Sequence, residues 1–428
     1  MKKILSLAIA AVLLASLSAY SAQAQAGFGN FSYSGAYAAG QFRDVRSADW
    51  FAPYVEDAYN FGFFRGSSGS AFDPGGRLTL GEAVTLAARV RSIYHTGSAV
   101  FSETVPYYSA YADYAVLHGI IDAHMDYGKP ATRGSFARMM HNALPPEAFP
   151  VINEIPDYGI CDVAPDSAVG AATYALYRAG VLSGSDRYGT FFADSYITRA
   201  EACAMTVRLA NPAARVDMLL PAALPAETIF QRSADAVFML EMFDERGDSI
   251  RTGSGFFISA SGLALTNLHV LDFALSATIT LYSGEVYPVR GVHAFSDDNN
   301  LVIFSADSDR DSWSFLTLAD SGLIEAGNAV YALGSPRGLI NTMSEGIISY
   351  SRREVNWDTL IQFTAPISFG SGGSPLLNGL GQVVGVASST YTAGQNLNLA
   401  VPINMAKALK PGSLMTLAEF TKRFDRES

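Results

Sequence analysis

The stretch that decides the fold of the second half is "TAPISFGSGGSPLLNGLGQVVGV", Thr364 to Val386. It sets a glycine- and serine-rich turn before a run of apolar residues, the pattern of a tight turn that leads into strands. The turn holds the serines Ser368, Ser371 and Ser374. Which of them, if any, attacks a carbonyl determines the function of the chain.

The sequence on both sides of this stretch is rich in short alternating runs. They are separated by Gly, Asn, Asp and Ser, and include "AVFMLEMF", "GSGFFIS", "LALTNLHV", "ATITLY", "NAVYALG" and "GQVVGVAS". Short strands at this spacing with few helical segments predict an all-β barrel or sandwich.

Three phrases make the prediction sharper: "GSGFFISASGLALTNLHVL" (253–271), "VYALGSPRGLINTMSEGIISYSRR" (330–353) and the stretch quoted first. In this order and spacing, residues 229–410 resemble the trypsin-like serine peptidases of the HtrA type. The resemblance implies an all-β double barrel with the active site between the barrels. It also implies hydrolysis of peptide bonds through an acyl-enzyme, with no metal or cofactor.

The same resemblance assigns the base and its orienting partner. His269 follows a Thr-Asn dipeptide at a strand end and is expected to act as general base and then as general acid. The family has an aspartate directly before the next hydrophobic strand, "LVIF", but here that residue is Asn300. Asp298 lies on the same side of the chain and is the better substitute if the loop bends.

The nucleophile position departs from the family phrase, which is Gly, any residue, Ser, Gly, Gly, Pro. Counting back from Pro375 puts Gly372 at the serine position. A shift of one residue would keep the Ser-Gly-Gly triplet, so Ser371 is the first candidate and Ser374 the second, with Ser368 a structural strand residue. Backbone N–H groups of Gly370 and Gly372 are expected to form the oxyanion hole.

The first half repeats itself between residues 41 and 215, at a spacing of roughly 55 to 65 residues. Each copy has a helix, a Gly-containing turn and a second helix, and Thr198 with Glu201 has the spacing of a capping box. Copies one and three resemble the S-layer homology domain, a helical module that attaches exported proteins to cell-wall polysaccharide.

That resemblance implies glycan binding by Trp50, Arg133 and Arg199. A guanidinium can pair in bidentate fashion with acidic groups of a wall glycan, although the arginines could instead only cap their helices. Arg199 stands in the intact Thr-Arg-Ala-Glu element, so we expect it to contribute more than Arg133.

Composition and the N-terminus indicate export. Residues 1–26 have two lysines, an apolar run and small residues, as in a secretory signal peptide. No later segment is long and apolar enough to span a membrane. The net charge of −11 argues against nucleic acid as a partner. Cys161 and Cys203, which we expect in one repeat and within reach of each other, are either a disulfide or two buried thiols.

The sequence therefore predicts a multidomain, secreted protein associated with the cell wall. Its expected parts are a signal peptide (1–26), three S-layer homology repeats (41–215), a Pro/Ala-rich linker (216–228), the peptidase domain (229–410) and a tail (411–428). Its expected partners are wall polysaccharide and protein substrates. The leading hypothesis is an endopeptidase that acts on misfolded or surface proteins. The alternative is a pseudopeptidase, impaired at Asn300 and Gly372, that binds proteins.

Overall fold

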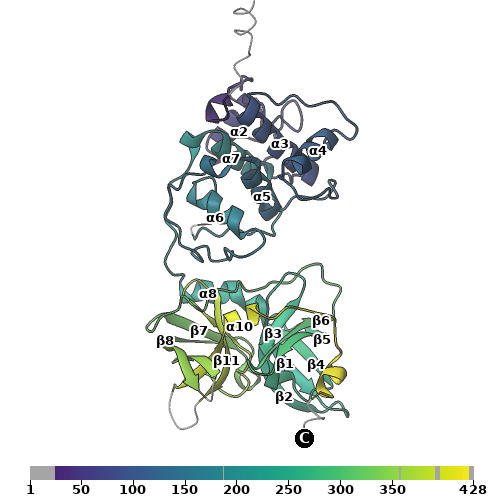
Figure 1. Ribbon diagram of the computed structural model, residues 1–428, viewed down its shortest axis with the longest axis vertical. Helices are drawn as coiled ribbons and strands as arrows, with labels where there is room; N and C mark the ends of the chain where they lie inside the picture. Colours follow the sequence, from purple (N-terminus) through teal and green to yellow (C-terminus); the bar gives the residue numbers. More distant parts are fainter. Residues whose placement is uncertain (1–24, 187, 356–357, 391–395, 424–428) are drawn as a thin grey trace, which may run out of the picture. The chain divides into compact units, whose positions relative to one another are not determined.

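The computed structural model describes residues 25–186, 188–355, 358–390 and 396–423 (Figure 1). Nearly all of the predicted signal peptide lies outside these residues. The chain divides into two compact units. The first extends to Ile155 and includes Pro165–Ser185 and Phe191–Leu219. The second consists of Pro156–Ala164, Asp186–Thr190 and the chain from Leu220 onward.

The first unit is helical, with two helices in each of the three predicted copies. The helices are α2 (Ala52–Asn60), α3 (Leu80–Thr96), α4 (Ser109–Leu117), α5 (Arg133–Ala143), α6 (Gly170–Arg178) and α7 (Arg199–Ala210). The second helix of each copy begins after a threonine that accepts a hydrogen bond from the backbone three residues on. Thr79 and Thr198 complete capping boxes with Glu82 and Glu201, which satisfy exposed N–H groups at both ends of the box.

The three copies meet in a closed ring of backbone hydrogen bonds. Ala131 N–H donates to the carbonyl of Leu78 (2.8 Å), Ile197 N–H to that of Ala131 (3.0 Å), and Leu78 N–H to that of Ile197 (3.3 Å). Each of these residues lies just before the second helix of its copy. The copies are therefore arranged about one approximate threefold axis, which the degenerate second copy shares with the other two.

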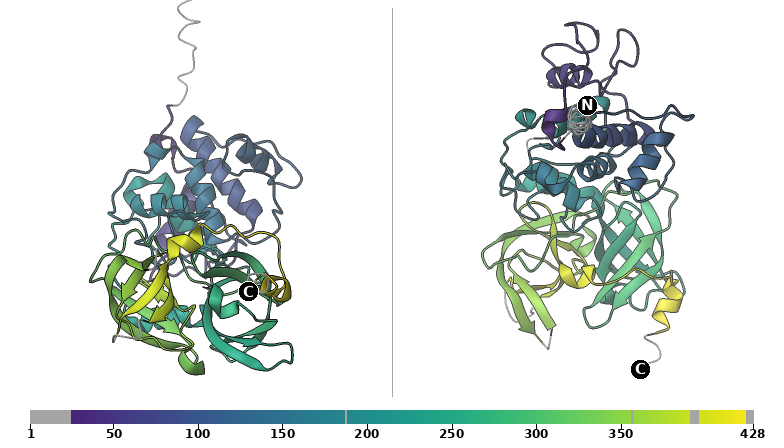
Figure 2. Two further views of the ribbon diagram at one scale, coloured as in Figure 1. Left: turned by 60° about the horizontal axis from the view of Figure 1, so that its bottom comes forward. Right: turned by 45° about the horizontal axis from the view of Figure 1, so that its top comes forward.

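The second unit contains two closed antiparallel barrels, seen beside each other in Figures 1 and 2. The strands of the first are β1 (Val237–Phe243), β2 (Ser249–Phe257), β3 (Leu263–Asn267), β4 (Ser276–Leu281), β5 (Val286–Ser296) and β6 (Leu301–Ala306). Those of the second are β7 (Ala329–Gly334), β8 (Thr342–Val355), β9 (Asp358–Phe363), β10 (Pro375–Leu377), β11 (Val383–Thr390) and β12 (Asn398–Pro402). This confirms the predicted double barrel.

Apolar side chains from both barrels form one shared core. Phe256 and Leu265 of the first barrel pack with Leu333 and Val386 of the second, all of them fully buried. The helices α8 (Ala226–Ser233) and α10 (Ile403–Lys407) contribute to the same cluster through residues such as Ile229. The barrels are thus fixed to each other, so side chains on their facing loops can hold a constant geometry.

The C-terminal segment is part of the first barrel and not a loose tail. It forms α11 (Leu417–Thr421), which lies beside that barrel in Figure 2. Leu417 and Phe420 are buried in its core, and the Phe420 ring meets the Phe295 ring edge-on at 5.3 Å. The sequence interpretation missed this helix because the segment is short and its apolar residues are few.

The two cysteines lie in different units, so the prediction that they share one repeat is wrong. Cys161 packs against the barrels of the second unit, whereas Cys203 is buried in α7 of the first. Both thiols are free. The loop that carries Cys161 belongs to copy three by sequence but makes its apolar contacts with the barrels, which sequence periodicity cannot reveal.

Candidate active site

The register of β3 against β6 brings His269 and Asn300 together. Asn267, the last residue of β3, pairs with Leu301, the first residue of β6. The ladder continues for one more bond, because the N–H of Leu268 donates to the carbonyl of Asn300 at 3.0 Å. His269 follows in the one-turn helix α9 (Leu268–Leu271). Asn300, the residue directly before β6, is therefore held next to His269, as the sequence predicted.

Asn300 contacts His269 through its side-chain amide. Its Oδ1 accepts a hydrogen bond from the His269 backbone N–H at 3.0 Å and lies 3.0 Å from Nδ1 of the ring. Its Nδ2 lies 2.8 Å from the same Nδ1 and donates to Ser388 Oγ at 3.1 Å. Asp298 is exposed and makes no hydrogen bond to His269 in the described structure. The position is therefore held by an uncharged amide.

This amide favours a proton on the far side of the ring. The His269 backbone N–H can only donate, so Oδ1 must face it, and this leaves Nδ2 as the nearest atom to Nδ1. An amide N–H beside Nδ1 needs the lone pair of that nitrogen as its acceptor. The proton of the neutral ring then lies on Nε2. An aspartate would favour the opposite tautomer, in which Nε2 is free to accept a proton.

Gly372 stands where a nucleophile would be needed. A Cβ added to Gly372 would lie 3.2 Å from His269 Nε2 and 3.6 Å from Cγ2 of Val270. The backbone of Gly372 is outside the left-handed region, so an L-residue could occupy the position. This geometry supports the strict register counted back from Pro375 over the shifted one. No side chain at the apex of the turn faces the histidine.

The neighbouring serines are both buried and are directed away from His269. Ser371 is 4% exposed, and its Oγ accepts from the Ser368 N–H at 3.3 Å. Ser374 is 1% exposed; its Oγ faces Gly334 and has no hydrogen-bond partner among the residues that the structure describes. Neither hydroxyl is hydrogen-bonded to His269 in the described part of the chain. Ser368 lies in the loop after β9 and not in a strand.

The predicted oxyanion donors lie on either side of Ser371 in the turn. The N–H groups of Gly370 and Gly372 donate no hydrogen bond within the described residues. Ser254 of β2 holds the turn from the other barrel: its N–H donates to the Gly372 carbonyl at 2.9 Å, and its Oγ to the Gly370 carbonyl at 2.7 Å. Sequence reasoning missed Ser254, although it stands in the quoted phrase "GSGFFIS".

Asn267 is a second contact that the sequence interpretation did not assign. Its Oδ1 accepts from the N–H of Gly373 at 2.8 Å, which ties the end of β3 to the turn of the other barrel. Gly373 has φ +87°, and a Cβ there would come within 2.0 Å of Thr266 Oγ1. The Thr-Asn dipeptide before the histidine thus fits only a glycine at this position.

A hollow of about 240 Å³ lies beside the turn, bounded by β7, β8 and residues 366–374. Ser371 and Ser374 line it, together with small or apolar residues such as Ala332, Pro366 and Ile367. No charged side chain is among its lining residues. Phe369, directly before Gly370, is 89% exposed.

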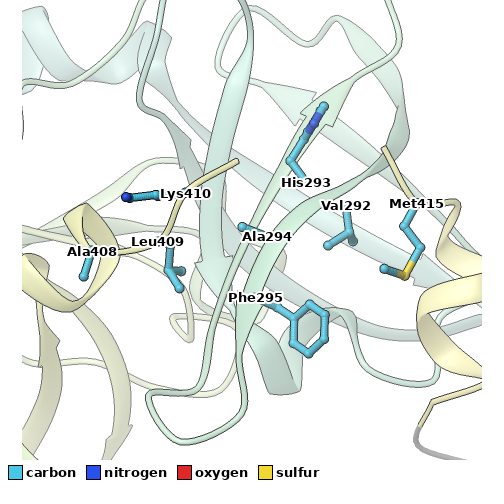
Figure 3. Close-up of a pocket in the computed structure, with 8 residues that line it drawn as sticks. All are labelled: Val292, His293, Ala294, Phe295, Ala408, Leu409, Lys410 and Met415. Atoms are coloured by element: carbon cyan, nitrogen blue, oxygen red, sulfur yellow. The ribbon is translucent and has the colours of Figure 1, made fainter. Parts of the chain in front are cut away.

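The other histidine of the first barrel belongs to a separate hollow of about 400 Å³, between β5 and the segment 408–415 (Figure 3). His293 and Lys410 are its polar side chains, and Figure 3 shows them pointing apart. The His293 ring is hydrogen-bonded through Nε2 to Ser305 Oγ (2.9 Å). This hollow therefore has no group paired for catalysis, which agrees with the prediction that His293 is a surface residue.

In the helical unit, two of the predicted glycan-binding residues share one hollow. Trp50, which is 57% exposed, and Arg133 line a space of about 360 Å³ with Glu201, Arg208 and the backbone turn at 183–185. Arg133 is buried and forms an ion pair with Glu201.

Arg199 does not line this hollow. Its Nε donates to the Phe72 carbonyl at 2.9 Å and its Nη2 to the Arg65 carbonyl at 2.8 Å. The guanidinium also lies over the ring of Phe72. The expectation that Arg199 contributes more than Arg133 therefore has no support from their contacts.

A family model for the trypsin-like peptidase domain matches residues 253–386, and one for the S-layer homology domain matches residues 41–84. The chain thus carries a trypsin-like serine endopeptidase domain after a helical region with an S-layer homology domain, a module of cell-surface or S-layer proteins. The predicted families and the double-barrel fold are confirmed at this level.

Within that class, the curated relatives are HtrA-type proteases. The chain is 34% identical over 167 residues to the putative serine protease HhoA of Synechocystis sp.. This match covers 37% of the present chain and 42% of the relative. It is 33% identical over 188 residues to the mitochondrial serine protease HTRA2 of Bos taurus, with 41% and 40% covered. The chain therefore spans about two fifths of the length of these relatives.

A solved structure of the HtrA-type protease AlgW with a tripeptide is also similar, at 26% identity and a TM-score of 0.40, covering 43% of this chain and 62% of that one. Among the described residues, no helix has the length and apolar character to cross a membrane. Nor do the described residues include a cluster of three or more His, Cys, Asp or Glu side chains that could hold a metal ion.

Proposed function

We propose that this chain is exported, is tethered to the cell wall, and uses its HtrA-type peptidase domain to bind polypeptide segments without cleaving them. The observation that carries the proposal is the glycine beside the histidine. A Cβ on Gly372 would lie 3.2 Å from His269 Nε2, so the glycine leaves the histidine without a hydroxyl at the position where the acyl-enzyme would have to form.

The orienting group strengthens this conclusion. Formation of the acyl-enzyme needs a general base that removes the hydroxyl proton as the oxygen attacks. With Asn300 Nδ2 at 2.8 Å from Nδ1, the favoured tautomer of the neutral His269 ring carries its proton on Nε2 and cannot accept another there. Of the nucleophile, the base and the oxyanion donors, the first two are thus lost. Each loss is due to a different residue, Gly372 and Asn300.

The parts that bind a polypeptide remain. The N–H groups of Gly370 and Gly372 are free to donate to a backbone carbonyl, and the exposed Phe369 ring offers aromatic surface beside them. The adjoining hollow carries no charge, which supports a preference for small or apolar side chains. Misfolded or surface proteins would offer such segments.

The second candidate is slow hydrolysis through Ser371. It is favoured by the position of this residue directly beside Gly372 and by the curated relatives, which are named serine proteases. The turn would have to move, because Ser371 Oγ now accepts from the Ser368 N–H and the residue is almost fully buried. This candidate requires a rearrangement, whereas the binding function requires none.

The tether is supported by the hollow at Trp50. An exposed indole face can stack on a sugar ring, and the guanidinium groups of Arg133, which is paired with Glu201, and Arg208 line the same hollow. The signal-peptide pattern supports export to the compartment where such a polysaccharide occurs.

The test is to incubate the full chain with fluorescent casein and to measure binding by anisotropy and fragments by gel in the same samples. We expect binding with no fragments over many hours. Fragments that persist through purification and disappear in Ser371→Ala would establish the second candidate instead. Absence of both binding and fragments would contradict the proposed function.

A further inference from the structure

The space left by the missing nucleophile is bordered by hydrogen-bond donors. We infer that it binds the α-carboxylate at the C-terminal end of a polypeptide. This inference rests on the proposed function, because only a cleft that does not cleave would retain a chain end as its ligand. Three donors carry it: the N–H groups of Gly370 and Gly372, and the Nε2–H of His269.

The first donor is oriented by the loop after β7. The Arg337 N–H donates to the Phe369 carbonyl at 2.8 Å. In a planar trans peptide the next N–H points the opposite way, so the N–H of Gly370 points away from Arg337. A Cβ on Gly370 would lie 2.8 Å from the Ser335 carbonyl oxygen, and its φ is +90°, so the turn keeps this orientation only with glycine.

The second donor is oriented by the turn itself. The Ser371 carbonyl accepts from the Ser374 N–H at 3.0 Å, so the Gly372 N–H points out of the turn. The Ser254 hydroxyl reinforces the arrangement: it accepts from the Ser335 N–H at 2.8 Å and donates to the Gly370 carbonyl at 2.7 Å. Both donors are therefore fixed before a ligand arrives, which reduces the entropy lost on binding.

The third donor follows from Asn300. Its Nδ2 faces Nδ1 of His269, so the neutral ring presents Nε2–H. A Cβ on Gly372 would lie 3.2 Å from that nitrogen, so the glycine leaves this side of Nε2 uncovered by a side chain. With aspartate in place of Asn300 the neutral ring would present a lone pair, which repels an anion. Asn300 and Gly372 thus both favour a carboxylate as the ligand.

A carboxylate suits this site better than an internal peptide carbonyl. Its two oxygens can accept from all three donors, and hydrogen bonds to a charged acceptor are about twice as strong as neutral ones. In the described structure no carboxylate side chain is hydrogen-bonded to any of the three donors. The final side chain would meet uncharged surroundings, since no charged residue lines the adjoining hollow.

The experiment measures fluorescence anisotropy of the full chain with two fluorescein-labelled octapeptides. Both end in valine, one with a free carboxylate and one as the amide. We expect the carboxylate form to bind at least tenfold more tightly. Gly372→Ala keeps the N–H but fills the space beside Nε2, so the preference should fall below threefold. His269→Phe, which removes the third donor, should reduce it at least fivefold.

The matched control is Gly412→Ala. A Cβ there would lie 3.6 Å from the His293 carbonyl oxygen, an ordinary contact, and outside the turn. The Gly412→Ala variant should keep the full preference for the carboxylate peptide. Thermal unfolding checks that each variant folds. Equal affinity for the two peptides, or a preference that survives in both Gly372→Ala and His269→Phe, overturns the inference.

These outcomes separate the inference from the proposed function. If casein binds but neither peptide does, only the carboxylate inference fails. If casein does not bind either, the proposed function fails as well. If mass spectrometry finds either octapeptide hydrolysed by the wild-type chain, the non-cleaving function is wrong, whatever the relative affinities are.

Discussion

Restoring the two lost groups should restore peptidase activity, and the structure gives the expected size of each step. In Gly372→Ser the new Cβ lies 3.2 Å from His269 Nε2, so the ring needs to move by only a few tenths of an ångström. The single variant should still be slow, because an asparagine beside a trypsin-type histidine lowers turnover by roughly ten-thousand-fold. Adding Asn300→Asp should recover about that factor, equivalent to about 5 kcal/mol of transition-state stabilisation.

The assay is the hydrolysis of fluorescent casein by the wild type, both single variants and the double variant. Asn300→Asp alone should be inactive, because it supplies a base without a nucleophile. The matched control adds Ser371→Ala to the double variant and should change little. If the double variant folds normally, as judged by its thermal unfolding, but hydrolyses casein no faster than the wild type, the assignment of Gly372 to the nucleophile position is refuted.

Three further predictions concern the rest of the chain. Arg133→Ala should reduce retention of the full chain on a cell-wall preparation more than Arg199→Ala, because Arg133 shares a hollow with Trp50 and Arg199 donates to backbone carbonyls; the reverse order would contradict this. Phe420→Ala should cost about 3–5 kcal/mol in the free energy of unfolding, measured with urea, since the ring is fully buried, and a loss under 1 kcal/mol would mean that α11 is not docked. Cys161 and Cys203 should resist iodoacetamide in the native protein, because burial raises the pKa of both thiols. Both should react after denaturation without reductant; if neither reacts under that condition, they form a disulfide.

The sequence predicted the architecture well where the signal was periodic and local. Strand alternation gave the barrels, and the positions of Thr79 and Thr198 marked helix starts that the structure has as capping boxes. His269 and Asn300 could be placed opposite each other because one ends a strand and the other precedes its antiparallel partner.

What the sequence could not give depended on contacts between distant segments. The choice between Gly372 and Ser371 is one of backbone position within a glycine-rich turn, and it is set by Ser254 and Asn267 from the other barrel. The loop of Cys161 likewise packs on the second unit, although the repeat pattern places it in the first.

The central claim, that the wild-type chain has no activated serine, is tested most directly by intact mass after incubation with a fluorophosphonate. This reagent adds to a serine that a neighbouring base has activated. With Gly372 beside Nε2 and both flanking serines directed elsewhere, we predict no adduct on the wild type and one adduct on the Gly372→Ser/Asn300→Asp variant. One adduct on the wild type that is lost in Ser371→Ala or Ser374→Ala would contradict the account.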